Sequence, residues 1–167
     1  MRTTVLGLLL AMCAACAGDL PAPTGASVPF LLQGDAQVGR VEVIADPESL
    51  SASSRALLRE RGALATVRQS ALDWFDHRSR FDPDGELELR VRVRELRLRS
   101  YATALLFAGI SGADRLEASV VASRHGTVLK TYAVGAASAV GGRPWSDPTE
   151  RLQRLARMLG QRIALGL

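Results

Sequence analysis

Few residues in this chain have the type and spacing that metal binding requires. Asp73, Asp76 and His77 lie three and four residues apart, so on a helix they would share one face and could ligate a metal ion. A closed metal site needs four ligands, and no fourth one follows in the sequence. A solvated helix end is the simpler interpretation, and we expect neither a metal nor another cofactor.

Nucleophilic catalysis has equally little support. Ser111 lies in the sequence GISGA, which is not the G-x-S-x-G turn that exposes a nucleophilic serine in hydrolases. Neither His77 nor His125 has an evident partner that would orient its ring. His125 precedes Gly126, and this pair is typical of a hairpin tip. We therefore expect no enzyme, and a hydrolase is only the third functional hypothesis.

The clearest chemistry belongs to Cys16. Arg2 is followed by an apolar run, Val5 to Met12, and then by small residues, which is the order of a secretory signal. The run is too short to span a bilayer, which needs about 20 apolar residues. Ala14 and Ala15 precede Cys16, and this resembles the lipobox of bacterial lipoproteins, in which the cysteine becomes the first mature residue and its thiol is acylated.

This resemblance has further implications. Cys13 stands where the lipobox usually has Leu. It is itself a poorer candidate for acylation, because bulky Met12 precedes it. Three acyl chains, palmitate among them, would make the lipid bilayer a permanent partner through Cys16. Ala17 stands where Asp favours inner-membrane retention in similar families, so we expect the periplasmic face of the outer membrane. The inner membrane, or a soluble periplasmic protein cleaved without lipidation, are the alternatives.

Composition indicates one folded domain behind this anchor. Residues 1–15 are the predicted signal peptide, residues 16–36 a flexible, proline-containing tether, and residues 37–167 a single domain. Apolar residues make up 47% of the chain, so it is not a disordered sequence. The formal net charge of +4 is too small to indicate a nucleic-acid partner.

The first half of the domain reads as a strand followed by a helix. Apolar residues alternate over 38–45, as in a strand, and recur at helical spacing over 51–78. We expect one long or kinked helix, whose helical region begins at Asp46-Pro47. Gly62 could instead end a first helix and leave residues 63–67 as a short strand.

The second half reads as three strands and a helix. In ELELRVRVRELRLRS the apolar phase flips at Glu95, which predicts a β-bulge near Arg94. Residues 114–124 and 127–137 predict a hairpin in which Ala122 faces Leu129. The last helix should begin at Asp147-Pro148. It should bury one apolar stripe, made of Leu152, Leu155, Ala156, Leu159 and Ile163. Its arginines should lie away from this stripe: Arg151, Arg154, Arg157 and Arg162.

These elements predict an α+β fold in the order strand-helix-strand-strand-strand-helix. Helices with one apolar face each can cover one face of a four-stranded sheet, which gives a two-layer sandwich. The last three strands would form a meander, and the first would join them through a right-handed crossover.

The stretch from the long strand onwards resembles a family of known sequences. GELELRVRVRELRLRS, GISGADRLEASVVAS and TVLKTYAV, followed by a Gly-rich break and an Arg- and Leu-rich helix, are similar to uncharacterised proteobacterial lipoproteins with a domain of unknown function. The resemblance covers residues 85–167. It implies an envelope lipoprotein and brings no catalytic residues.

Two surfaces are candidates for binding. Arg90, Arg92 and Arg94 follow one another on the polar face of the long strand and could contact an anionic surface, although a solvated face balanced by glutamates is the simpler interpretation. The connection over 101–110 is apolar where connections are usually polar. It either packs under the helices or exposes a partner or membrane contact made of Leu105, Leu106, Phe107 and Ile110.

Two functions follow as hypotheses. The first is a non-catalytic binding or accessory module, anchored in a membrane, for an envelope protein complex of unknown identity. The alternative is a carrier or accessory protein for an apolar small molecule or lipid held between sheet and helices. An open apolar cavity of several hundred cubic ångströms would favour the carrier, and a sealed core would oppose it.

Overall fold

The computed structural model describes residues 36–99, 113–138 and 147–167, which hold four strands and three helices. In chain order these are β1 (Val38–Ala45), α1 (Ala52–Glu60), α2 (Ala63–His77), β2 (Leu87–Arg97), β3 (Arg115–Arg124), β4 (Thr127–Ala137) and α4 (Pro148–Leu165).

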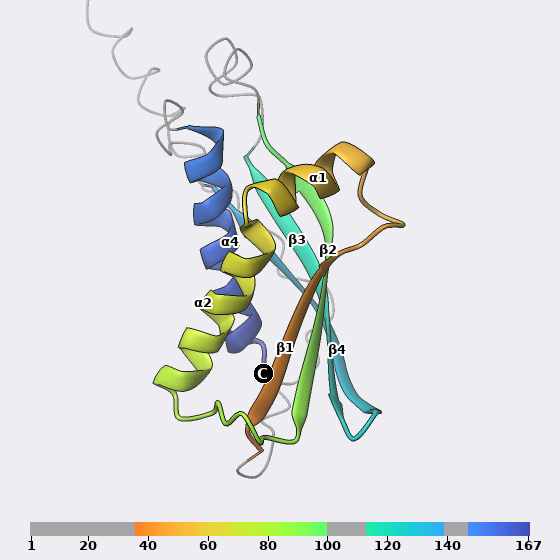
Figure 1. Ribbon diagram of the computed structural model, residues 1–167, viewed down its shortest axis with the longest axis vertical. Coiled ribbons are helices and arrows are strands. Elements are labelled where there is room, and N and C mark those ends of the chain that lie inside the picture. The colour runs from red at the N-terminus through yellow and green to blue at the C-terminus, as the bar shows by residue number, and fades with distance from the viewer. Residues whose placement is uncertain (1–35, 100–112, 139–146) are drawn as a thin grey trace, which may run out of the picture.

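The strands form a single mixed sheet with the order β1-β2-β3-β4 (Figure 1). β1 is parallel to β2, so the helices α1 and α2 form the crossover between them, whereas β2, β3 and β4 are antiparallel neighbours. α2 packs against β1 and α4 packs against β3 and β4, and the two helices contact each other along their length. The predicted two-layer α+β sandwich is therefore confirmed.

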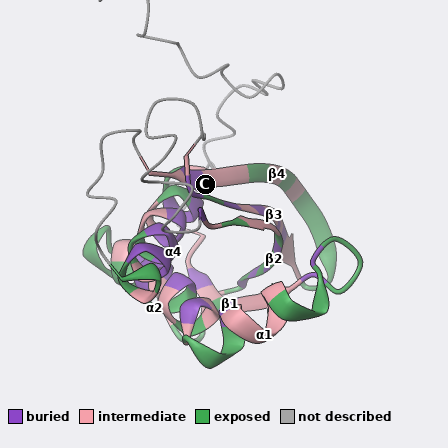
Figure 2. Ribbon diagram, turned by 90° about the horizontal axis from the view of Figure 1, so that it is seen from above, coloured by how far each residue is buried: buried purple, intermediate pink, exposed green. Residues whose placement is uncertain are grey.

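The core lies between this helical layer and the sheet (Figure 2). The alternating strand pattern of β2 buries Leu87, Leu89, Val91 and Val93, and every predicted stripe residue of α4 is buried as well. α2 and α4 approach closely at Gly160, where an added Cβ would lie 2.6 Å from the carbonyl oxygen of Val67. Only glycine permits this backbone contact, which holds the helical layer tightly together.

The helical region after β1 differs from the prediction. It contains two helices, because Gly62 adopts a φ of +65° and turns the chain between α1 and α2. Neither the single long helix nor the short strand over 63–67 is present. Figure 1 shows α1 crossing the view while α2 runs down it. The apolar spacing continues past Gly62 because both helices bury side chains in the same core.

The start of the first helix was also predicted wrongly. α1 is capped by Ser51, whose hydroxyl accepts a hydrogen bond from the Ser54 N–H at 3.1 Å. Asp46 instead closes a turn before the helix: its carboxylate accepts from the Ser49 hydroxyl at 2.7 Å. The Asp-Pro pair at 46–47 therefore marks a turn, and the same pair at 147–148 does begin α4.

The pairing register shifts between each pair of neighbouring strands, and two of these shifts bear on the predictions. The predicted bulge in β2 is confirmed, since the pairing register with β3 shifts between Val93 and Glu95. A second shift lies between β3 and β4 and makes Ala122 pair with Lys130, so the predicted partner Leu129 is wrong. The shift turns Tyr132 toward α4, where its hydroxyl donates to the carbonyl oxygen of Ile163 at 2.9 Å.

Candidate functional site

Two of the predicted sites lie outside the described residues. They are the lipid-attachment residue Cys16 and the apolar connection with Leu105, Leu106, Phe107 and Ile110. Both remain predictions. The arginines of β2 and the residues at the base of the apolar connection can be placed.

The arginines of β2 lie on the sheet face that the described helices leave uncovered. Arg90 pairs with Glu42 of β1, with Nε and Oε2 3.3 Å apart, and the Arg94 Nε is 3.8 Å from the carboxylate of Asp46. The Arg90 side chain is 60% exposed. Arg92 has no ion pair within the described residues. Two of the three arginines thus have acidic partners, one in β1 and one in the turn that follows it, and their side chains remain largely exposed.

A hollow of about 440 Å³ lies on this face. Its charged lining alternates in sign, with Arg40, Arg90 and Arg92 against Glu42 and Glu88. Toward β3 and β4 the lining is small and uncharged, with Val121, Ser123, Gly126 and Val128. Such a surface offers paired charges next to an apolar border, which suits contact with a mixed polar and apolar partner.

Asp46 at the edge of this face is held in its ionised form. The hydrogen bond from Ser49 lowers the pKa of the Asp46 carboxyl below its usual value, and the Glu48 N–H and the charges of Arg92 and Arg94 act in the same direction. Asp46 therefore remains a negative partner for Arg94 at neutral pH.

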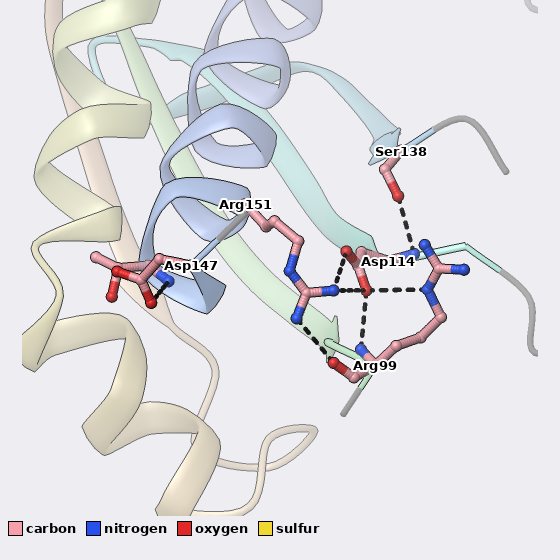
Figure 3. A network of polar contacts seen from close by, with 6 residues as sticks. Arg99, Asp114, Ser138, Asp147 and Arg151 are labelled. Carbon is pink, nitrogen blue, oxygen red and sulfur yellow. Dashed lines mark hydrogen bonds and ion pairs between the residues drawn. The ribbon is translucent and has the colours of Figure 1, made fainter. Parts of the chain in front are cut away.

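A buried polar cluster that the sequence analysis missed joins three elements (Figure 3). Asp114, directly before β3, accepts hydrogen bonds from the Arg99 N–H at 2.8 Å and from Arg151 Nη1 at 3.0 Å. Arg151 Nη2 donates to the Arg99 carbonyl oxygen at 2.8 Å. The Asp114 N–H donates to the Ser138 hydroxyl at 3.2 Å. The Asp114 carboxylate thus binds the end of β2 and the first turn of α4, and the Asp114 N–H binds the residue after β4.

The cluster is almost completely removed from solvent. The side chains of Arg99, Asp114 and Arg151 are 6%, 1% and 8% exposed. Two guanidinium groups share one carboxylate, so each charge depends strongly on Asp114. The adjoining hollow measures about 20 Å³, room for about one water molecule. The described contacts of the cluster hold together the chain segments that meet at Asp114.

The buried cluster corrects the prediction that Arg151 lies away from the apolar stripe. Arg151 is buried, and so is Arg99, which follows β2 in the same arginine-rich stretch. The sequence contained a signal for Arg151, because it stands four residues before Leu155 and eight before Leu159, in phase with the stripe. No comparable periodicity marks Arg99 or Asp114.

The candidate catalytic and metal-binding residues remain apart from any site. Asp73, Asp76 and His77 are exposed, and the Asp73 carboxylate accepts a hydrogen bond from Gln69 at 2.7 Å. Within the described residues, no group of three His, Cys, Asp or Glu side chains could hold a metal ion. His125 lies at the tip of the β3–β4 hairpin with a φ of +49°. Among the same residues, no helix is long and apolar enough to cross a membrane.

Comparison with known proteins finds similarity in structure alone. No protein-family profile and no curated protein matches the chain. A dodecamer of PelC from Paraburkholderia phytofirmans is similar at 12% identity and a TM-score of 0.44, covering 77% of this chain and 88% of that one. A Xanthomonas campestris protein of the DUF330 family is similar at 10% identity and a TM-score of 0.48, covering 77% and 81%.

A third solved structure comes from Caulobacter crescentus CB15 and is provisionally described as a lipoprotein. It is 15% identical, with a TM-score of 0.39 and coverage of 75% of this chain and 85% of that one. The sequence resemblance names uncharacterised lipoproteins with a domain of unknown function; the Xanthomonas protein belongs to such a domain family, and the Caulobacter protein is described as a lipoprotein. At these identities the likeness concerns the fold and says nothing of what this chain binds.

Proposed function

We propose that this chain is a lipid-anchored envelope protein on the periplasmic face of the outer membrane, and that it is a non-catalytic binding or accessory module of an envelope protein complex. The observation that carries this proposal is the one-sided cover of the sheet. The described helices cover one face, and the other face keeps a hollow of about 440 Å³ with both charged and apolar lining. The lipobox at Cys16 would hold this surface at the membrane.

A sealed core argues against the carrier hypothesis. Five residues would line a cavity between sheet and helices. Leu89, Val91, Leu155 and Leu159 are each at most 1% exposed, and Leu57 is partly buried against the same core. The larger hollow lies on the opposite face of the sheet and the smaller one beside Arg151. A bound lipid or other apolar molecule would therefore require the described layers to separate.

Two surfaces are proposed for the protein partner. The first is the face of β2 with Arg90, Arg92 and Arg94, where Arg92 has no ion pair among the described residues and is available to an acidic group. The second is the apolar connection with Leu105, Leu106, Phe107 and Ile110. Its two ends are fixed by the buried cluster, because Arg99 and Asp114 flank it.

The anchor is tested by replacing the cysteine that should be acylated. Cys16→Ser should abolish labelling with a fatty-acid analogue and release the protein from washed membranes, because the acyl chains are the anchor. Cys13→Ser is the matched control and should leave both properties unchanged. Acylation of the Cys16→Ser protein would contradict the assignment.

The partner surfaces are tested by crosslinking in intact envelopes. Arg92→Glu and Phe107→Asp should each remove a defined crosslinked product while the melting temperature stays unchanged, and Arg59→Glu on exposed α1 is the control. Loss of folding in Phe107→Asp would mean that the protein itself covers the connection. Unchanged folding and unchanged crosslinks in both variants would contradict the proposed role.

A further inference from the structure

The exposed large apolar side chains of the described residues gather at one end of the domain. They are Val128, Leu129 and Leu165, whose exposed fractions are 60%, 41% and 56%. The other large apolar residues of the described part are at least partly buried. Exposed apolar residues that gather in one region mark an interaction surface, whereas scattered ones do not.

Strand pairing defines this end of the domain. Val38, Leu87, Arg124 and Thr127 form one row across the sheet, next to the tip of the β3–β4 hairpin. We call this the hairpin end (Figure 1, lower part). The last turn of α4 reaches it, because Lys130 Nζ donates to the Gly166 carbonyl oxygen at 2.8 Å. Val128 and Leu129 on the hairpin and Leu165 on α4 therefore belong to the same end, where Val128 borders the hollow on the open face of the sheet and Leu165 belongs to the helical layer.

The chain enters the domain at this end. Ala36, the first described residue, stands two residues before Val38, and the Val38 N–H donates to the Arg80 carbonyl oxygen at 2.8 Å. Everything between the domain and Cys16 is thus joined to the hairpin end. The apolar connection joins the opposite end, where Arg97 pairs with Arg115.

We propose that the hairpin end contacts the bilayer in which Cys16 is anchored, with Val128, Leu129 and Leu165 inserted among phospholipid headgroups. This inference rests on the proposed lipid anchor and adds the orientation of the domain. The apolar connection and its buried cluster then face away from the membrane, toward a partner in the periplasm.

The position of the tether favours lipid over a second copy as the occupant. If residues 16–36 form the predicted tether, a flexible chain of about 20 residues would span about 25 Å root-mean-square and would keep the hairpin end close to the membrane surface. Because the domain is held near the bilayer, its contact with lipid is effectively intramolecular. A small apolar surface is then enough to keep the domain on the membrane. Apolar insertion carries the contact in this proposal: Arg124 is paired with Glu86 at 3.4 Å, and Lys130 Nζ is bonded to the Gly166 carbonyl oxygen. We expect the contact to persist on zwitterionic lipids.

The test uses the acylated full-length mature protein, whose only native cysteine is the lipidated one. Val128→Cys and Leu129→Cys each accept a single polarity-sensitive fluorophore, and Ser53→Cys on exposed α1 is the control. The proteins are reconstituted in vesicles of phosphatidylethanolamine with a minor share of phosphatidylglycerol. On vesicles, fluorophores at positions 128 and 129 should emit at shorter wavelength, and their quenching by iodide should fall severalfold. The fluorophore at position 53 should change in neither property.

Each outcome is decisive. Emission at 128 and 129 that matches position 53 overturns the contact. The same shielding without vesicles, rising with the concentration of the Cys16→Ser protein, assigns the surface to a second copy and also overturns it. Fatty-acid labelling of the same samples reports the anchor separately. An acylated protein with exposed probes refutes the orientation alone, and an unlabelled protein refutes the anchor.

Discussion

Arg90 and Arg99 belong to the same arginine-rich stretch of sequence and have opposite environments. Arg90 lies on the open face of the sheet, 60% exposed, and its partner Glu42 is 42% exposed. Arg99 lies past the end of β2, 6% exposed, and shares Asp114 with Arg151. The exposed pair exchanges hydration for a weak attraction, whereas the buried charges have lost their hydration and depend on one another.

This difference separates two tasks that the same side chain can perform. Water screens the row on β2, which remains available to a partner. The buried cluster cannot bind a partner without opening, and it fixes the chain ends around the apolar connection instead. The arginine row on β2 is thus itself a proposed contact surface, whereas the buried arginines hold the chain beside the apolar connection.

The largest effect should come from removing the shared carboxylate. Asp114→Asn keeps the side-chain volume and leaves two guanidinium groups buried without a counter-charge, so unfolding free energy should fall by about 3–5 kcal/mol. Urea denaturation measures this fall in the free energy of unfolding. Asp84→Asn, in the exposed turn before β2, is the control and should change stability by less than about 0.5 kcal/mol. A loss below about 1 kcal/mol at Asp114 would show that water reaches the cluster.

A comparable effect should come from the apolar part of α4. Leu159 is fully buried, so Leu159→Ala should cost about 2–5 kcal/mol through lost burial and the cavity left behind. Leu165→Ala on the same helix is the control: at 56% exposure, its effect on the non-acylated protein should stay within about 0.5 kcal/mol. Equal effects of the two substitutions would contradict the observed packing of α4.

The smallest effect should come from the exposed pair. A double-mutant cycle with Glu42→Ala and Arg90→Ala should give a coupling energy of about 0.2–1 kcal/mol, which falls as salt is added. Arg92→Ala, which breaks no ion pair among the described residues, provides the baseline. A coupling above about 2 kcal/mol, or one that salt does not change, would remove the distinction between the two arginine environments.

Local patterns in the sequence predicted most of the fold. Alternation along β2, the flip of phase at Glu95 and the start of α4 at Asp147 depend on neighbouring residues, and all three agree with the structure. The four-stranded sheet with helices on one face followed from the order of these elements. The exposed setting of the β2 arginines followed from the same alternation.

Tertiary structure decided the features that depend on residues distant in sequence. Asp114 and Arg151 are 37 residues apart and meet because β3 and α4 begin near each other, and no local periodicity in the sequence indicates this. Gly62 was a candidate helix end in the sequence, and only the structure shows that its positive φ separates α1 from α2. The register shift beside Ala122 likewise became visible only in the strand pairing. A side chain's burial depends on what other elements bring to it. The sequence therefore determined which residues could form charged pairs, and the fold determined which of these pairs are buried away from solvent.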